Sequence, residues 1–226
     1  MAFGGHNAAP VVDRSGALNV FYTVGTALLL GRSTDQGASY ATTKVSSVTP
    51  LQARPTAYRA TVYPAAAASA DGALVVAWAD GRNAGHGNDI LASRSLNNGA
   101  SWSTPQVVNQ DAGSADQLMP AVTAGSDGAV TVAWLDTRND PARVNYDVYL
   151  ARTTPGGVGF SFGANQRVTN VASNPNNDPQ LQGSLIGDYF AIAAGAGMVY
   201  PVWTDTRNNN EDIYLAPVSV SSVPNN

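Results

Sequence analysis

One seven-residue line recurs along this chain of 226 residues and constrains its fold more than any other feature. An apolar residue and a tryptophan are followed, at fixed positions, by an aspartate, an arginine and an asparagine. The copies occupy residues 77–83, 133–139 and 202–208, and each lies between two short apolar runs. This pattern predicts a chain built from near-copies of one β-unit.

The spacing of the copies indicates the architecture. Tyr22, Trp78 and Trp134 follow one another at intervals of 56 residues, and Trp203 comes later because a longer loop intervenes. The aromatic residue of each unit lies in an apolar run, at residues 18–24, 73–79, 129–135 and 198–204, which is typical of a strand covered on both faces. Shorter candidate strands flank each run, with glycine-containing turns between them.

Four antiparallel strands repeated at this period predict an all-β fold, a β-propeller of four-stranded blades. We expect a single propeller domain over residues 1–226, with four blades at about 7–48, 62–109, 118–169 and 188–222. A two-sheet sandwich is the alternative, but it does not explain the repeat.

The composition of the chain limits the classes of partner that it could bind. The net charge is −4 and Lys44 is the only lysine, so no basic stripe is present for nucleic acid. No apolar run could span a bilayer, which argues against a membrane partner. Cysteine is absent, His6 and His86 are isolated, and no calcium-loop pattern occurs, so no metal or cofactor is expected. We expect a secreted or extracytoplasmic protein whose leader is absent from this chain, with a cytoplasmic location as the alternative.

A second repeated signature follows the third strand of each unit. It reads Ser-Thr-Asp-Gln-Gly-Ala-Ser-Tyr at residues 33–40 and Ser-Leu-Asn-Asn-Gly-Ala-Ser-Trp at 95–102. A degenerate copy occupies residues 153–160. The signature resembles the Asp-box of bacterial sialidase-like propellers with BNR repeats. The resemblance implies serine and aspartate bonded to turn amides, a glycine with positive φ, and an aromatic ring packed between sheets.

Strand order predicts where a site would lie. Turns of a four-stranded meander alternate between the two ends of a blade, so the Asp-x-Arg-Asn motifs share one end with the long connectors at 49–63, 110–119 and 170–187. The motif has two interpretations. In the structural one, each arginine bridges the motif aspartate and a second aspartate, Asp89, Asp147 or Asp212, and ties a hairpin. In the functional one, Arg82, Arg138, Arg207, Asp80 and Tyr63 bind a polar ligand.

Residues at the start of each first strand should point toward the propeller axis. They are His6 and Asn7, Tyr63, residues 117–119, and Asp188 with Tyr189. These positions do not repeat, so a site that breaks the symmetry would draw on them. Asp188 and Tyr189 follow the longest loop and are the first catalytic candidates, together with Asp136 and Asp205.

The sequence leaves three alternative functions. Aromatic, amide and charged side chains at a mouth suit sugars, so we expect first a glycan-binding propeller. The resemblance implies a sialidase set of arginines, a tyrosine nucleophile helped by glutamate, and an acid/base aspartate. Glu211 is the only glutamate, so that set cannot be transferred. A glycoside hydrolase using Asp188 with Asp136 or Asp205 is the alternative, and a structural or protein-interaction module is the third.

The number of blades bears on the oligomeric state of the protein. Four closed blades predict a monomer, whereas part of a larger ring would expose blade faces and pair with another copy as a homo-oligomer. The outer strand of the last blade could come from residues 218–221 or from residues 2–3.

Overall fold

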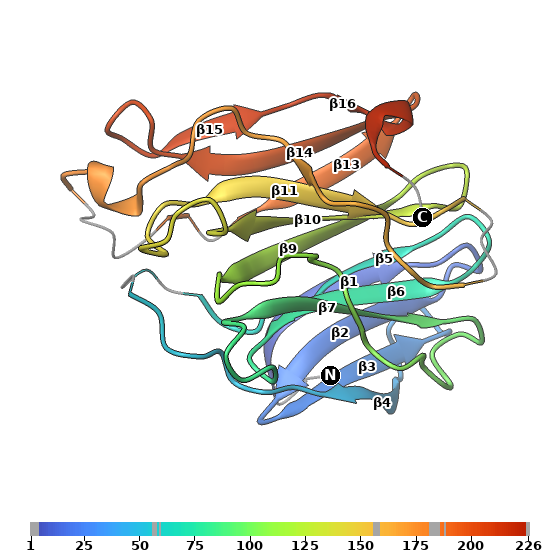
Figure 1. The fold of residues 1–226 in the computed structure, drawn as a ribbon. Helices are drawn as coiled ribbons and strands as arrows, with labels where there is room; N and C mark the ends of the chain where they lie inside the picture. The colour runs from blue at the N-terminus through green and yellow to red at the C-terminus, as the bar shows by residue number, and fades with distance from the viewer. Residues whose placement is uncertain are drawn as a thin grey trace.

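The chain folds into four antiparallel sheets that stack in sequence order (Figure 1). The computed structural model describes residues 5–55, 58, 60–155, 159–180, 186–187 and 189–224, with the side chain of His6 left out. The first sheet lies at one end of the stack and the last sheet at the other. Four separate four-stranded sheets confirm the predicted propeller blades and exclude the two-sheet sandwich.

The strands of each blade follow one another in space as they do along the chain. The first blade contains β1 (His6–Val12), β2 (Leu18–Val24), β3 (Ala27–Ser33) and β4 (Ala41–Ser47). The second contains β5 (Ala65–Ala68), β6 (Leu74–Asp80), β7 (Asp89–Ser95) and β8 (Gln106–Val107). The third contains β9 (Gln117–Ala124), β10 (Val130–Asp136), β11 (Asp147–Arg152) and β12 (Gln166–Arg167).

The last blade departs from this order. It contains β13 (Ala191–Gly195), β14 (Met198–Asp205), β15 (Asp212–Leu215) and β16 (Val218–Ser219). Strand β16 pairs with β14 beside β15, through Val199 and Val218, and therefore continues the third strand position. Residues 218–221 do not supply the outer strand, which corrects one expectation, and residues 2–3 lie outside the described part of the chain.

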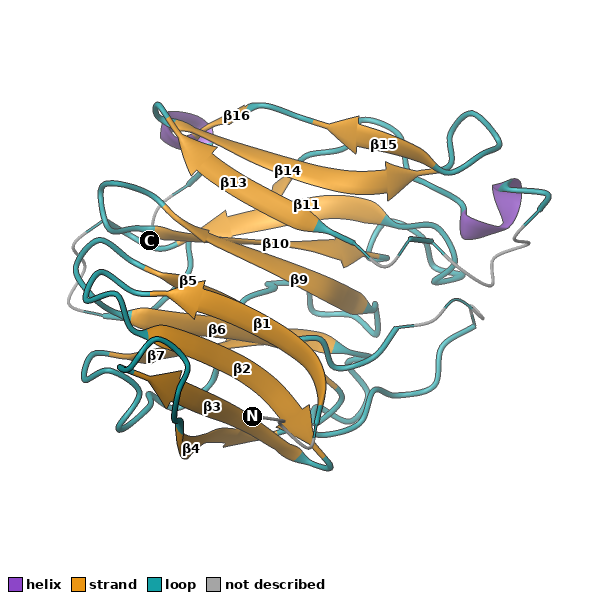
Figure 2. Cartoon of the chain, turned by 180° about the vertical axis from the view of Figure 1, so that it is seen from behind, coloured by secondary structure: helices purple, strands orange, loops and turns teal. Residues whose placement is uncertain are grey.

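The first strands of the blades form the inner side of the stack (Figure 2). Strands β1, β5, β9 and β13 contact one another in chain order. Each carries an alanine opposite the residue that precedes the repeated aromatic: Ala9, Ala65, Ala121 and Ala191. A small side chain at this position suits backbones that converge, because neighbouring strands can approach closely.

The repeated tryptophans are packed between blades. Trp78 and Trp134 are fully buried and Trp203 is nearly so. Every residue of β6 and β10 is buried, because each of these strands has a blade on both of its faces. Burial of large aromatic rings at each interface contributes strongly to the stability of the stack.

The serine-rich turns have the local geometry that the resemblance implies. Gly37 N donates to Ser33 Oγ at 2.8 Å, and Ser39 N donates to Asp35 Oδ1 at 2.9 Å. The second turn repeats both bonds with Asn97 in place of aspartate. Gly37 and Gly99 have φ values of 91° and 84°, a conformation that glycine adopts without steric cost. The Trp102 ring meets Phe21 edge-on across the first two blades, at 5.6 Å between ring centroids.

Helical structure in the described residues is limited to two single 3-10 turns, η1 (Pro175–Asn177) and η2 (Val220–Ser222). Within these residues, none of the helical segments has the length and apolar character needed to cross a bilayer.

Candidate functional site

The Trp-x-Asp-x-Arg-Asn motif forms a closed set of contacts at the end of each β-hairpin. In the third blade, Trp134 Nε1 donates to Asp136 Oδ2 at 2.7 Å. The backbone N–H of Arg138 donates to Asp136 Oδ1 at 2.8 Å, and its guanidinium donates twice to Oδ2, from Nε at 2.9 Å and from Nη2 at 2.6 Å. The Asp136 carboxylate thus holds both the indole ring of Trp134 and the turn that contains Arg138.

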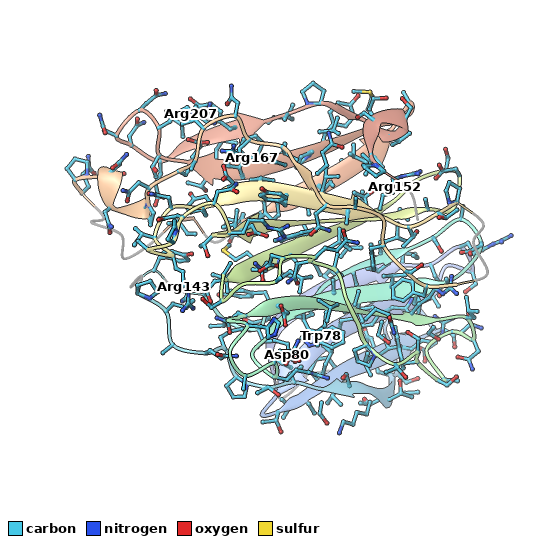
Figure 3. The ribbon with its side chains drawn as sticks, viewed as in Figure 1. Trp78, Asp80, Arg143, Arg152, Arg167 and Arg207 are labelled. Carbon is cyan, nitrogen blue, oxygen red and sulfur yellow. The ribbon has the colours of Figure 1, made fainter. Side chains whose placement is uncertain are left out.

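The same contacts recur in the second and last blades. Trp78 Nε1 donates to Asp80 at 2.9 Å and Trp203 Nε1 donates to Asp205 at 3.0 Å (Figure 3 labels the first pair). Burial alone would raise the pKa of Asp80 and of Asp205, but the hydrogen bonds from the arginine and the tryptophan outweigh it and lower both values.

The asparagine, and not the arginine, reaches the second aspartate of the hairpin. Asn139 Nδ2 donates to Asp147 at 2.7 Å, Asn208 Nδ2 donates to Asp212 at 3.0 Å, and Asn83 contacts Asp89. The expected arginine fork between two carboxylates is therefore wrong in detail. In two hairpins the guanidinium lies over a tyrosine ring instead, 4.2 Å from the centroid of Tyr149 for Arg138 and 4.3 Å from that of Tyr214 for Arg207.

Burial favours the structural interpretation of this motif. The carboxylates of Asp80, Asp136 and Asp205 are 0% exposed, so they present no surface to a ligand. The guanidinium groups keep a partly exposed edge, and the motif asparagines Asn139 and Asn208 are exposed, so these groups and not the carboxylates could touch a solute. Catalytic roles for Asp136 and Asp205, and a ligand-binding role for Asp80, have no support in this geometry.

A hollow of about 700 Å³ lies where the four inner strands meet. Four equivalent positions, each two residues before the shared alanine, line it with three kinds of side chain: Asn7, Tyr63, Met119 and Tyr189. The sequence predicted that these residues face the axis, and the structure bears this out. Gln117 does not line the hollow, because it is buried and bonded to Asn109 and Asp136.

Two of the four positions have unusual backbone geometry. Asn7 and Met119 have φ values of 60° and 51°, which place them in the left-handed region although neither is glycine. Both lie where the strand register shifts by an irregularity, in the β1–β2 and β9–β10 pairs. Such bulges re-aim side chains and concentrate near functional sites. The amide of Asn7 is further held by Thr61 Oγ1 at 3.2 Å.

A second hollow of about 760 Å³ adjoins the first and shares Asn7 and Tyr63 with it. Its other walls are the end of the first blade at Thr23 and Gly25, and the connector that includes Leu51 and Thr61. The sequence singled out this connector for its length but not for these residues. Their contribution depends on how the connector crosses the first blade, which the local sequence does not encode.

The lining of both hollows is uncharged within the described residues. Alanine, proline, valine, methionine and aromatic side chains predominate, with Asn7, Thr23, Thr61, Tyr63 and Tyr189 as polar groups. Tyr189 is 88% exposed, so its ring is free to contact a ligand. Asp188 lies outside the described residues. Among the described residues no group of three or more His, Cys, Asp or Glu side chains is placed to hold a metal ion.

Glu211 is a titratable group that the sequence does not place among the candidate site residues. It precedes β15 in the last hairpin, and its Oε1 atom is buried without a hydrogen-bond partner among the described groups. Burial, together with the charge of Asp178, raises the pKa of Glu211. Its backbone N–H donates to Asp178 at 3.3 Å, which holds the two carboxylates near each other. The one sequence feature that singles out Glu211 is that the chain contains no other glutamate.

Replacing Glu211 by glutamine should therefore stabilise the fold at neutral pH. A carboxyl whose folded pKa is raised contributes stability that is complete below its unfolded pKa and is lost as pH rises through the folded value. The gain from E211Q should be present at about pH 7 and vanish near about pH 4, where the wild-type carboxyl is protonated. Urea unfolding of both proteins at several pH values measures it. Equal stability of the two proteins at every pH would contradict the raised pKa.

Comparison with solved structures finds the same fold in chains of low sequence identity. An ulvan lyase of polysaccharide lyase family PL25 is similar with a TM-score of 0.62 and 11% identity, over 95% of this chain and 53% of that one. The Hadza microbial sialidase Hz136 gives 0.56 and 16%, over 93% and 44%. An α-L-arabinanase of Penicillium chrysogenum gives 0.54 and 16%, over 92% and 73%.

The chain thus spans about half the length of the lyase and less than half the length of the sialidase. No protein-family model and no curated protein matches the sequence. At these identities the likeness establishes a shared propeller fold.

Proposed function

We propose that this protein binds glycans in the paired hollows at the inner strands, on the same end of the blades as the Asp-x-Arg-Asn motifs. One observation carries the proposal. Four equivalent positions hold Asn7, Tyr63, Met119 and Tyr189 around one hollow whose described lining is uncharged, so the side chain at this position varies between blades where a ligand could enter. The volume lies in the range of small-ligand sites.

The chemistry of the lining suits a sugar. A pyranose ring has apolar C–H faces that lie well on tyrosine, and hydroxyl groups that pair with amide and phenol oxygens. Tyr63 and Tyr189 supply the rings, while Asn7 supplies donor and acceptor groups. The partly exposed edges of Arg82, Arg138 and Arg207 lie toward the same end and would favour sugars that carry a carboxylate or sulfate. The named activities of the similar structures, on ulvan, on sialosides and on arabinan, support a carbohydrate ligand.

Substitution of the two tyrosines tests this proposal. Screening against a glycan array should identify a ligand, and titration calorimetry should then show that Tyr63→Ala and Tyr189→Ala each weaken binding by about tenfold or more, as loss of a stacked ring predicts. Leu96→Ala is the matched control, because Leu96 is an exposed apolar residue in a turn at the opposite end of the second blade. Binding that survives both tyrosine substitutions would locate the ligand elsewhere.

A carbohydrate-active enzyme is the second candidate, favoured by the hydrolases and lyases among the similar structures. The described lining offers no carboxylate to serve as acid or base, so Asp188 is the residue on which catalysis would depend. Release of reducing sugar or sialic acid that is abolished in Asp188→Asn would replace binding by hydrolysis. Absence of both binding and turnover would favour a protein-interaction module.

A further inference from the structure

The two hollows share a wall. The first, of about 700 Å³, lies against β1, β5, β9 and β13, the inner strands of Figure 2, and the second, of about 760 Å³, lies beside the end of the first blade. Asn7 and Tyr63 line both of them. Each volume is by itself in the range of a pocket that encloses one drug-sized ligand, which is larger than a single sugar unit. The pair therefore offers more room than a monosaccharide fills.

The wall between the hollows is held in place by hydrogen bonds. Asn7 Nδ2 donates to Thr61 Oγ1 at 3.2 Å and to the backbone oxygen of Val62 at 3.3 Å, and the backbone N–H of Tyr63 donates to the backbone oxygen of Thr61 at 2.9 Å. These bonds tie the start of β1 to the connector before β5, so the two sides of the wall keep a fixed spacing. Because the connector takes the amide nitrogen of Asn7, its Oδ1 atom is the group left to accept a bond from a ligand hydroxyl.

The two hollows offer different contacts to a sugar. Tyr63 and Tyr189 supply aromatic faces in the first hollow. In the second, Tyr63 is the only aromatic residue among the described lining, and aliphatic side chains such as Leu51 and Val62 form the walls with the hydroxyl of Thr61. A sugar ring can therefore stack in the first hollow, whereas the second supplies apolar contact with C–H groups and a hydrogen bond. This makes the first hollow the main binding position and the second its extension.

We propose that the ligand is an oligosaccharide that occupies both hollows at once and crosses the wall formed by Asn7 and Tyr63. The proposal rests on the proposed glycan-binding function and adds the length of the ligand to it. A single sugar unit in the first hollow leaves the second to water. A longer chain makes both sets of contacts while it loses translational and rotational freedom only once. Affinity should therefore rise with chain length until the second hollow is filled, and then level off.

Titration calorimetry with oligosaccharides of graded length tests the proposal. The probes are arabino-oligosaccharides of one to six units and ulvan oligosaccharides of two to six units, chosen from the polymers named for two similar structures, and the strongest glycan of the array shortened one unit at a time. For the sugar that binds, Kd should fall by about tenfold or more over the length at which the second hollow fills, and change little beyond it.

Thr61→Trp separates the contributions of the two hollows. Thr61 is exposed and lines the second hollow but not the first, so an indole at this position should fill the second hollow without unfolding the chain, as circular dichroism would verify. Its affinity for long oligosaccharides should drop to that for short ones, and short ones should bind as before. Thr61→Val is the matched control, because it loses the bond from Asn7 without filling the hollow and should keep the dependence on length. Tyr189→Ala should weaken all lengths alike, since Tyr189 lines the first hollow.

Failure of this proposal is distinguishable from failure of the glycan-binding function. Absence of binding for every glycan of the array and every oligosaccharide would overturn both. Binding whose Kd does not depend on length would overturn only the present proposal, because the first hollow would then hold the whole ligand. A dependence on length that survives Thr61→Trp would also overturn it, since the additional units would then bind outside the second hollow.

Discussion

Replacing Trp134 by alanine should lower the free energy of unfolding by about 3–5 kcal/mol, the usual cost of removing a fully buried large aromatic ring. Trp134 lies between the second and third blades and is 0% exposed. Its ring stacks on Tyr149 at 6.4 Å between centroids, and its Nε1 donates to Asp136 at 2.7 Å. The substitution leaves a cavity and removes a hydrogen bond from a buried carboxylate. Guanidinium unfolding followed by far-UV circular dichroism measures the loss.

A second variant separates the packing contribution of Trp134 from its hydrogen-bond contribution, and a third serves as a control. Trp134→Phe retains most of the packing but not the N–H group, so we expect a loss of about 1.5–3 kcal/mol, the usual contribution of a hydrogen bond to a charged group. Leu96→Ala, at an exposed turn, should change stability by less than about 0.5 kcal/mol. A loss of under about 1 kcal/mol for Trp134→Ala would mean that this residue is not an interblade core residue.

The blades could be predicted from the sequence because of where their central strands lie. A strand with a sheet on each face has no solvent-facing positions, so it appears as an unbroken apolar run. The runs expected at 73–79 and 129–135 correspond to β6 (Leu74–Asp80) and β10 (Val130–Asp136). The spacing of the aromatic residues then fixed the repeat, and the repeat predicted the architecture.

The outer strands were harder to predict. β8 and β12 contain only two residues each, and so short a segment has no periodicity to detect. The last blade shows the consequence, since residues 218–219 look like an outer strand but pair with β14. The choice between neighbouring partners depends on how the chain turns after β15, which the local sequence does not determine.

Some features of the candidate site could likewise be predicted from the sequence, and others could not. The positions of Asn7, Tyr63, Met119 and Tyr189 could be predicted because the first strand of each blade lies innermost, so residues at or just before its start lie near the axis. The partners of the motif arginines could not, because choosing between two nearby aspartates requires distances. Burial of Glu211 beside Asp178 depends on a long loop folding back against the last hairpin, a tertiary contact without a sequence signature.

Replacing Asp136 by alanine should cost about 3–5 kcal/mol of unfolding free energy, because it leaves a largely buried guanidinium with only the carboxylate of Asp111, 3.7 Å away, as a counter-ion. Asp136 accepts bonds from Trp134 Nε1, from the backbone of Arg138 and from its side chain, all at 2.9 Å or less. The side chain of Arg138 is only 16% exposed, so water compensates poorly for the lost carboxylate. Thermal and denaturant unfolding of the purified variant measure the effect.

The same experiment decides what the repeated motif is for. Asp205 makes equivalent bonds to Trp203 and Arg207, so a structural role predicts a loss of the same order for Asp205→Ala. It also predicts that the double substitution of Asp136 and Arg138 by alanine costs less than the two single losses added together, since removing both partners leaves no unpaired charge. A variant of Asp136 that kept full stability while losing a glycan-directed activity would instead make this carboxylate part of a site. Its burial and its fully occupied oxygens argue for the structural result, because a carboxylate with no exposed surface can neither touch a sugar nor exchange a proton with it.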